Sequence, residues 1–274
     1  MTTSSAVLAS QSPMPHAPKF DAAVTLLSGY FTGLVPPTPL QAMRDIDACP
    51  AATRSLLRFA DDIGRAVGYD REQDGRLIQD IFPVRGSENE QVSTSSKVML
   101  GSHTETAFHP HKPKYVVLLC LRGDQKAATT YADVRDIVPQ LSVDQLAVLA
   151  TDQFVTTIDP SFMSNGEPDI EVRIAPLTST ARGWVLVYDE LLMRGTTLEA
   201  QAALNALHRA VKEATQHVVL AAGDLLVIDN DRAVHGRTPF TPRYDGTDRW
   251  LKRSLVMRTL PLNDVAGRVV QTRL

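Results

Sequence analysis

The chain has 274 residues, a formal net charge of −3 and a hydrophobic fraction of 43%. These values are ordinary for a globular protein, and the near-neutral charge argues against a surface that binds nucleic acid or anionic membranes. No apolar run approaches the roughly 18 residues that a membrane-spanning helix needs, so we expect no membrane partner.

The N-terminal 20 residues are rich in Ser, Thr and Pro, and they lack the basic start and solid apolar centre of a signal peptide. We expect residues 1–20 to form a disordered arm and residues 21–274 to form one domain with N-terminal helices. The two cysteines, Cys49 and Cys120, are far apart in the chain, which implies no disulfide framework. A reducing cytoplasm is the default location for such a chain.

Helices are predicted from apolar residues at three- and four-residue spacing, with Pro, Gly or Ser at the ends. They span residues 39–48, 51–67, 133–149 and 198–215. Gly68 is expected to stop the second, Pro139 to interrupt the third, and Ser142 to cap its continuation. The fourth lies in a helical insertion near 196–217, whereas residues 21–35 show a helical or mixed pattern.

Strands are predicted where short apolar segments lie between turn residues. They span residues 78–84, 98–105, 115–122, 127–131, 154–158, 171–175, 184–188, 225–230 and 250–258. The segment at 115–122, YVVLLCLR, is apolar throughout, as expected for a strand covered on both faces. Many short strands with helical insertions predict a mainly β, cupin-like jelly roll (double-stranded β-helix) rather than a βαβ sheet.

The sequence SHTETAF contains the first candidates for chemistry, His103 and Glu105. On a strand, residues two apart point to the same face, so the imidazole and the carboxylate can converge. A second imidazole would complete a two-histidine, one-carboxylate facial triad, which leaves other positions of a six-coordinate metal open. His235, in AVHGRTPF, is placed for that role. His109 and His111 are rival partners, but HPHKP is more simply a solvated turn.

A cationic segment, RTPFTPRYDGTDRWLKR, follows His235. Arginine offers a planar fork that matches a carboxylate, and a metal that binds a dicarboxylate needs a fixed cation for the far end. If the segment is a strand, Arg249 and Arg253 share a face. The alternative is that they pair with surface acids such as Asp245 and Asp248.

Two blocks together, HTETAFHPHKPKYVVLLCLRGDQKAATTYAD and DNDRAVHGRTPFTPRYDGTDRWLKRSLV, resemble the clavaminate synthase-like (TauD-related) group of Fe(II)/2-oxoglutarate dioxygenases. Within it, the chain is most similar to bacterial hydroxylases of free arginine, asparagine and lysine. The resemblance runs from about Ser87 to Arg258, and the combination of both blocks is specific. It implies Fe(II), 2-oxoglutarate and O₂ as cofactor and cosubstrates.

The resemblance also implies roles for individual residues around the metal. Arg249 matches the arginine that binds the distal carboxylate of 2-oxoglutarate. Thr130 matches a threonine whose hydroxyl helps to hold the same molecule, with Thr129 as the nearby rival. The residues that match the iron ligands are His103, Glu105 and His235.

Further residues match the family's substrate contacts. Arg253 matches the arginine that grips the substrate α-carboxylate, and Glu105 or a loop acid would take the α-ammonium. Asp189, in VLVYDELL, falls where the family places an acid for the polar end of the substrate. Gln91 and Ser93 match a substrate-contacting loop before the HTE segment.

The implied reaction couples oxidative decarboxylation of 2-oxoglutarate to succinate and CO₂ with hydroxylation of an unactivated C–H bond. We expect a free L-amino acid as substrate, and a basic one such as arginine or lysine, because Asp189 suits a cationic end. Desaturation, cyclisation and a taurine-type reaction on another small acid are alternatives. Glu105 argues against a halogenase, which needs a small residue there.

Two other classes compete with an oxygenase. A zinc hydrolase can also use two histidines and a glutamate, and a jelly roll can be a binding module with a relic triad. Neither class requires Arg249 together with Thr130. The sequence predicts no oligomeric state.

Overall fold

The computed structural model describes residues 20–41, 46–163, 170–261 and 265–272. The arm predicted over residues 1–20 lies outside these ranges, except for Phe20. Within them, no helix combines the length and the apolar character that crossing a bilayer requires.

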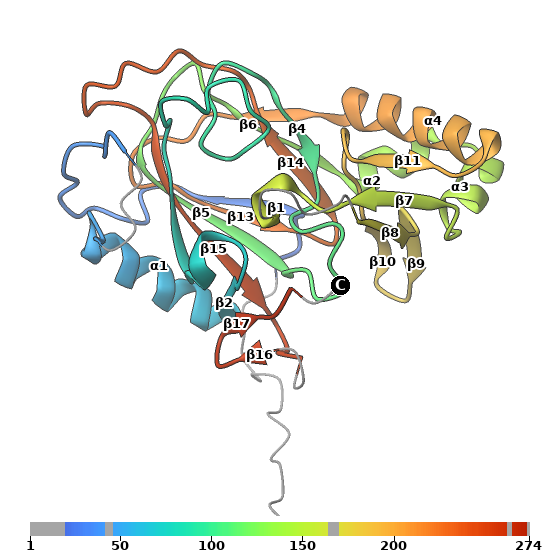
Figure 1. Cartoon of the computed structure of the whole chain (residues 1–274), viewed down its shortest axis with the longest axis horizontal. Helices are drawn as coiled ribbons and strands as arrows, with labels where there is room; N and C mark the ends of the chain where they lie inside the picture. Colours follow the sequence, from blue (N-terminus) through green and yellow to red (C-terminus); the bar gives the residue numbers. More distant parts are fainter. Residues whose placement is uncertain (1–19, 42–45, 164–169, 262–264, 273–274) are drawn as a thin grey trace, which may run out of the picture.

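Two β-sheets form the centre of the molecule (Figure 1). The strands of the larger, eight-stranded sheet are β1 (Val24–Leu27), β13 (Leu225–Asp229), β5 (Tyr115–Arg122), β15 (Trp250–Met257), β2 (Arg65–Tyr69), β17 (Val269–Val270), β16 (Val265–Ala266) and β3 (Ile78–Ile81), which pairs with β15. The strands of the four-stranded sheet are, in order, β12 (Gln216–Val218), β6 (Thr129–Asp133), β14 (Ala233–Arg237) and β4 (Leu100–His103). Strand pairs far apart in sequence therefore build both sheets.

Strand β5 lies in the middle of the larger sheet and is buried on both faces, as its apolar sequence predicts. Val116 and Leu118 pack in the interior cluster, and Leu118 reaches the cavity described below. Val117 and Leu119 alternate with them and pack in the cluster that contains helix α1. The strand therefore forms the wall between the interior of the protein and the helix outside.

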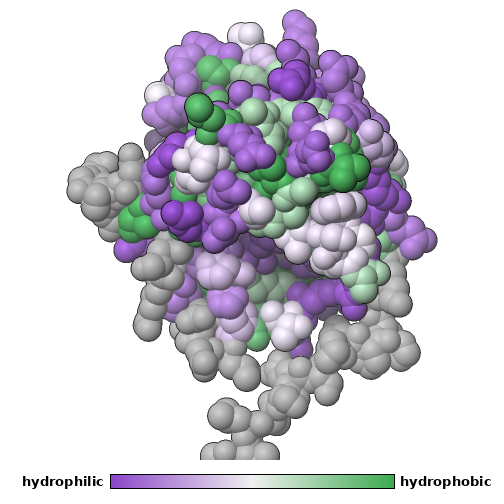
Figure 2. Space-filling view, turned by 90° about the vertical axis from the view of Figure 1, so that its right-hand side faces the viewer, coloured by the Kyte–Doolittle hydropathy of each residue, from purple (hydrophilic) through white to green (hydrophobic). Residues whose placement is uncertain are grey.

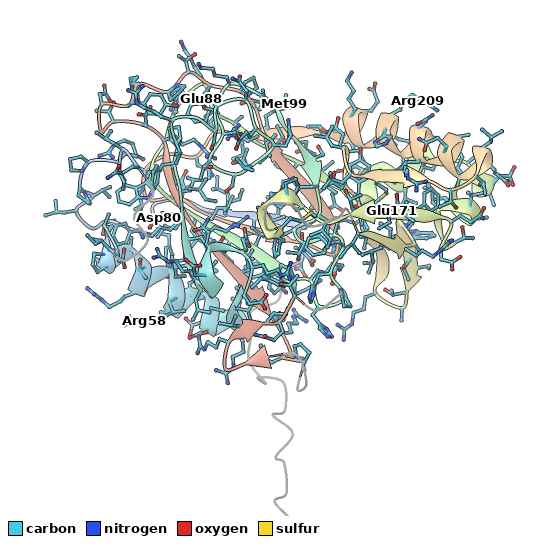
Figure 3. The ribbon with its side chains drawn as sticks, viewed as in Figure 1. Arg58, Asp80, Glu88, Met99, Glu171 and Arg209 are labelled. Atoms are coloured by element: carbon cyan, nitrogen blue, oxygen red, sulfur yellow. The ribbon has the colours of Figure 1, made fainter. Side chains whose placement is uncertain are left out.

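Helix α1 (Pro50–Ile63) covers the outer face of the larger sheet (Figure 1). Its buried side chains, including Leu56, recur at helical spacing, while Arg58 points away from the sheet (Figure 3). The helix predicted over 51–67 was too long, because the chain turns at Gly64 into β2. A Cβ at Gly64 would meet the carbonyl oxygen of Met257 at 2.5 Å, so glycine permits this close approach.

A second prediction was wrong in the N-terminal region. The described residues of the 39–48 segment lie in bends and irregular backbone, and residues 42–45 lie outside the described ranges. Two apolar side chains of this segment, Leu40 and Ile46, are 55% and 59% exposed, so its described part has no buried apolar face that would stabilise a short helix. Residues 21–35 contain strand β1 rather than a helix.

A group of helices and short strands forms the right-hand end of the molecule in Figure 1. Its elements are α2 (Val134–Ile137), α3 (Val143–Leu149), α4 (Leu198–Ala214), β7 (Phe154–Thr157), β8 (Glu171–Ile174), β9 (Leu177–Thr180), β10 (Gly183–Leu186) and β11 (Met193–Gly195). Single 3-10 turns occupy Gln73–Gly75, Val138–Gln140 and Pro160–Phe162. The surface of this end is largely hydrophilic, with apolar residues scattered in it (Figure 2), and Arg209 of α4 points outward (Figure 3).

The predicted helix signals at this end are confirmed. Ser142 forms a full capping box with Gln145 at the start of α3. Helix α4 begins after Thr197, whose side chain accepts a hydrogen bond from the N–H of Ala200, and it ends within one residue of the predicted boundary. Its apolar side packs with α2 and α3 in a separate core.

Candidate metal centre

Two of the three predicted metal ligands come from neighbouring strands. His103 is the last residue of β4, and in the antiparallel pairing it lies directly opposite His235 of β14. Their ring centroids are 4.5 Å apart. The cross-strand register therefore brings together two imidazoles that are far apart in the sequence.

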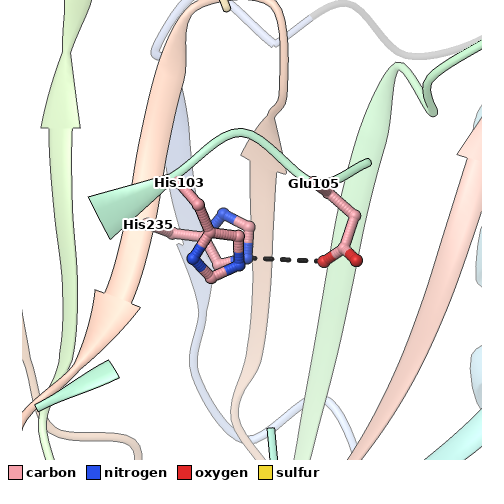
Figure 4. A group of neighbouring side chains, drawn as sticks. All are labelled: His103, Glu105 and His235. Atoms are coloured by element: carbon pink, nitrogen blue, oxygen red, sulfur yellow. Dashed lines mark ion pairs between the residues drawn. The ribbon is translucent and has the colours of Figure 1, made fainter. Parts of the chain in front are cut away.

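The third predicted ligand reaches the same point, although not for the predicted reason. Strand β4 ends at His103, and Glu105 lies in the turn that follows (Figure 4), so strand alternation does not place it. Thr106 then adopts a left-handed conformation with φ of 50°. The turn carries the Glu105 carboxylate to 3.6 Å from Nε2 of His235.

The geometry of these three side chains fits a metal ion. One ligand atom from each of His103, Glu105 and His235 lies within 4.8 Å of the others, and within the described residues this is the one such group of three or more His, Cys, Asp or Glu. Nδ1 of His103 lies 2.8 Å from the carbonyl oxygen of Gly101. A proton on that nitrogen leaves Nε2 as the ligand atom, an orienting contact typical of metal-bound histidine.

The charge states also fit a cation. Burial alone would raise the pKa of Glu105, but the charges of Arg253, His235 and His103 outweigh it and lower the pKa to about 2. Burial and the neighbouring His103 lower the pKa of His235 to about 4. At neutral pH the site thus presents a carboxylate and a neutral imidazole, the forms that bind metals.

The rival histidines lie elsewhere. His109 is buried, with its ring against that of Tyr69, and its Nδ1 accepts a hydrogen bond from the N–H of His111. The contacts of His109 with Tyr69 and with the His111 backbone therefore hold this turn away from the metal site, and neither ring belongs to the triad.

A cavity of about 840 Å³ adjoins the triad. Its wall includes residues from both sheets and from the polar loop at 85–96, as expected for a loop at a pocket mouth. Among the predicted site residues, those on the wall are His103, Glu105, His235, Arg249, Arg253, Asp189, Gln91 and Ser93. Thr130 is absent from it.

Of the two candidate threonines, Thr129 lies on the cavity wall. In the β6–β14 register Thr129 lies opposite Arg237, whereas Thr130 lies opposite Gly236. Because adjacent strand residues point to opposite faces, Thr130 faces away from the triad. The hydroxyl of Thr129 accepts a hydrogen bond of 3.3 Å from Arg249.

Arg249 and Arg253 point inward rather than to the surface acids. Asp248 accepts hydrogen bonds from the backbone N–H groups of Arg243 and Tyr244, and Asp245 accepts from Thr247. Within the described part of the chain Arg249 makes no ion pair, and burial lowers its pKa to about 10. A buried guanidinium without an ion-pair partner is suited to binding an anion.

Arg253 lies in a dense network beside the triad. It donates to both carboxylate oxygens of Glu105 at 3.1 and 2.9 Å, and it also donates to Gln79 and Glu72. Glu72 was missed by the sequence analysis, since REQDG carries no recognisable pattern. Its Oε2 is buried on the cavity wall without a hydrogen-bond partner, and burial raises its pKa.

Asp189 lies against the same strand end as His103, with which it forms an isolated β-bridge. Its Oδ1 accepts hydrogen bonds from the N–H groups of Leu191 and Leu192, and burial raises its pKa. Another of the acids on the cavity wall, Asp159, was not predicted. It lies near enough for its charge to raise the pKa of Asp189 further.

The two predicted loop residues differ in exposure. Ser93 is half-buried, whereas Gln91 is exposed. The Gln91 amide bonds to backbone atoms of Met99 and Gly101 at 3.0 and 3.2 Å, so it ties the loop to β4.

Two mainly antiparallel sheets enclose two imidazoles, a carboxylate and a buried guanidinium. This arrangement defines the class of mononuclear, facial-triad metalloproteins with a jelly-roll core. The chain belongs to the taurine catabolism dioxygenase TauD, TfdA family, whose model matches residues 43–255. It is an Fe(II)/2-oxoglutarate-dependent dioxygenase, with O₂ as the second cosubstrate.

Relatives of known activity support this assignment. L-lysine 3-hydroxylase of Catenulispora acidiphila is 36% identical over 247 residues, which is 87% of this chain and 69% of the relative. L-asparagine oxygenase of Streptomyces coelicolor is 36% identical over 228 residues, which is 82% of this chain and 68% of the relative.

Solved structures confirm the predicted jelly roll. The non-heme iron oxygenase OrfP, in complex with Fe, succinate and (3S)-hydroxy-L-Arg, matches with a TM-score of 0.82 and 29% identity, covering 91% of this chain and 82% of that one. Asparagine oxygenase, in complex with Fe(II), 2S,3S-3-hydroxyasparagine and succinate, matches with a TM-score of 0.81 and 33% identity, covering 92% and 80%.

Proposed function

We propose that the chain hydroxylates a free L-amino acid with a basic side chain, at a ferrous ion held by His103, Glu105 and His235. The observation that carries the proposal is the convergence of these ligand atoms on a cavity whose wall also includes the neighbouring acids Asp159 and Asp189. When bound, the iron would supply O₂ activation coupled to decarboxylation of 2-oxoglutarate. The protein's part is to hold the reactants and exclude water.

Arg249 would hold the distal carboxylate of 2-oxoglutarate. It is buried on the cavity wall and makes no ion pair among the described residues, so an incoming carboxylate would neutralise it. Thr129 stands beside it and faces the cavity. We therefore move the role predicted for Thr130 to Thr129.

Arg253 and Glu72 would hold the two charged groups common to all amino acids. Arg253, which donates to Glu105 and Glu72 in this structure, would turn part of its guanidinium to the α-carboxylate, the role that the resemblance implies for it. Glu72 offers a buried oxygen without a partner, which suits the α-ammonium. Because both belong to one network with Glu105, the α-carbon would lie beside the metal centre.

Asp189 and Asp159 would bind the far end of the substrate side chain. Two neighbouring carboxylates in a cavity repel each other, and a guanidinium or ammonium between them relieves that repulsion. An uncharged end such as a carboxamide would not. The acids therefore favour lysine, ornithine or arginine over asparagine.

The test is a substrate panel. The metal-free protein is loaded anaerobically with Fe(II) and 2-oxoglutarate, exposed to O₂ with each standard amino acid, ornithine and taurine, and assayed for succinate and product mass. We expect substrate-dependent succinate and a gain of one oxygen with a basic amino acid. Loss of two hydrogens would instead identify a desaturase or cyclase, and turnover of taurine alone would contradict the amino-acid assignment.

The acids are tested separately. In Asp159→Asn and Asp189→Asn the preference for a basic over a neutral substrate, measured as the ratio of kcat/KM values, should fall about tenfold each. The matched control is Glu190→Gln. In the wild type the Glu190 carboxylate is exposed and accepts a hydrogen bond from the Ser102 N–H. An unchanged ratio in both aspartate variants would remove the argument for a cationic side chain.

A further inference from the structure

One buried side chain, that of Asn230, holds the backbone of Glu105. Asn230 is fully buried in the turn between β13 and β14. Its Oδ1 accepts a hydrogen bond from the Glu105 N–H at 2.8 Å, and its Nδ2 donates to the Glu105 carbonyl at 3.1 Å. The amide thus pairs with both polar backbone atoms of Glu105, as a neighbouring strand would, at a point where β4 has already ended.

Asn230 is itself fixed by the connection between β4 and β5. Its Nδ2 also donates to the Pro113 carbonyl at 2.9 Å, and its backbone N–H donates to the Lys114 carbonyl at 2.9 Å. On the outer side, Lys114 pairs with Asp229 at 2.6 Å and with Asp231 at 3.0 Å. The β13–β14 turn is therefore held by buried hydrogen bonds on one side and by the partly exposed ion pairs of Lys114 on the other.

The backbone next to Glu105 needs such an anchor. Thr106 has a φ of 50°, which is unfavourable for a β-branched residue, and its hydroxyl donates to the Glu105 carbonyl at 2.8 Å. Without the Asn230 amide, the Glu105 N–H would be buried with no hydrogen-bond partner, which is unfavourable. The turn would then relax and carry the carboxylate with it.

We propose that Asn230 is a positioning residue of the metal centre. It sets the separation of the Glu105 carboxylate from His235, because β14 leaves the same turn and carries His235. The β13–β14 turn thus positions two ligands. It holds Glu105 through the side-chain amide of Asn230, and it sets the start of β14, which contains His235. The inference rests on the proposed role of Glu105 and His235 as metal ligands.

The experiment measures Co(II) binding to the metal-free chain, with three readouts: the dissociation constant, the visible spectrum at saturation and the Tm without metal. Asn230→Leu removes both hydrogen bonds to Glu105 at similar volume, and Asn230→Asp keeps the acceptor and loses the donor. The matched control is Asp224→Leu. Asp224 is also buried and also binds backbone N–H groups, those of Gly29 and Ala221, at the other end of β13.

We expect both Asn230 variants to bind Co(II) about 10–100-fold more weakly than the wild type and to show an altered spectrum. Asp224→Leu should lower Tm as much as Asn230→Leu while binding Co(II) within about twofold of the wild type. Asn230→Asp covers the case in which Asn230→Leu does not fold.

Two results would overturn the inference. One is wild-type affinity and spectrum in a folded Asn230→Asp, and the other is an equal loss of affinity in Asp224→Leu, since a general loss of stability would then explain both. If the wild type itself binds no Co(II) or Fe(II), the proposed metal centre fails together with the inference.

Discussion

At the scale of single residues, the choice between His235 and His109 decides which imidazole completes the triad. His235→Ala should abolish Fe(II)-dependent succinate formation, because it removes one of three ligand atoms. His109→Ala should lower Tm, since the ring is buried, and retain most of the turnover. Both are measured by succinate release under saturating 2-oxoglutarate. If His109→Ala lost turnover while His235→Ala retained it, the assignment of the third ligand would be reversed.

The two threonines of β6 provide a second residue-scale prediction. Thr129→Val should raise the KM for 2-oxoglutarate by about tenfold, as expected for loss of one hydrogen bond to a charged group. Thr130→Val, the adjacent control on the opposite face, should leave it within about twofold. An increase in KM with Thr130→Val instead would restore the original sequence-based choice.

Residue types and motif spacing predicted the triad and Arg249 because each is a charged or metal-binding side chain in a recognisable block. Glu72 and Asp159 were not predictable, since each is an ordinary acid in a polar loop. Only the tertiary structure buries Glu72 against Arg253 and brings Asp159 near Asp189. The choice between Thr129 and Thr130 depends on strand register, which the sequence leaves open by one residue.

At the scale of elements, Gly236 allows β14 and β4 to approach each other. A Cβ at this position would meet the carbonyl oxygen of Leu100 at 2.5 Å and the hydroxyl of Thr130 at 2.9 Å. Gly236→Ala should therefore push the two histidine-bearing strands apart and weaken Co(II) binding by at least tenfold, measured by titration.

The control for that variant is Ser142→Ala, which removes the capping box of α3 far from the triad. It should cost about 1 kcal/mol of unfolding free energy in urea titrations and leave Co(II) affinity unchanged. Equal Co(II) affinities in Gly236→Ala and the wild type would show that β4 and β14 can move apart without loss of metal binding.

Element types were predictable wherever one pattern dominates, as in β5 and α4. The errors lie where two patterns overlap. The run that ends in Ala66 and Val67 continues the apolar spacing of α1, yet these residues alternate between two cores as part of strand β2. The turn after His103 was hidden for a similar reason, because HTE fits a strand as well as a turn.

At the scale of the whole molecule, a metal that binds only the folded state must stabilise it. Without oxygen, Co(II) at about 100 times its dissociation constant should add about 2.7 kcal/mol to the unfolding free energy, seen as a rise in Tm. Chelation should reverse the rise, and His235→Ala should show none. A rise of the same size in that variant would place the ion elsewhere.

The direct pairing of His103 with His235 affects the local unfolding of strand β4. Strand β4 is four residues long and lies at the edge of its sheet, so it should be among the first segments to exchange its amide hydrogens. An ion bound by both rings would link β4 to β14 and oppose the separation of the two strands. Deuterium uptake at residues 100–103 should consequently slow on addition of Co(II), while uptake in the long central strand β5 stays the same.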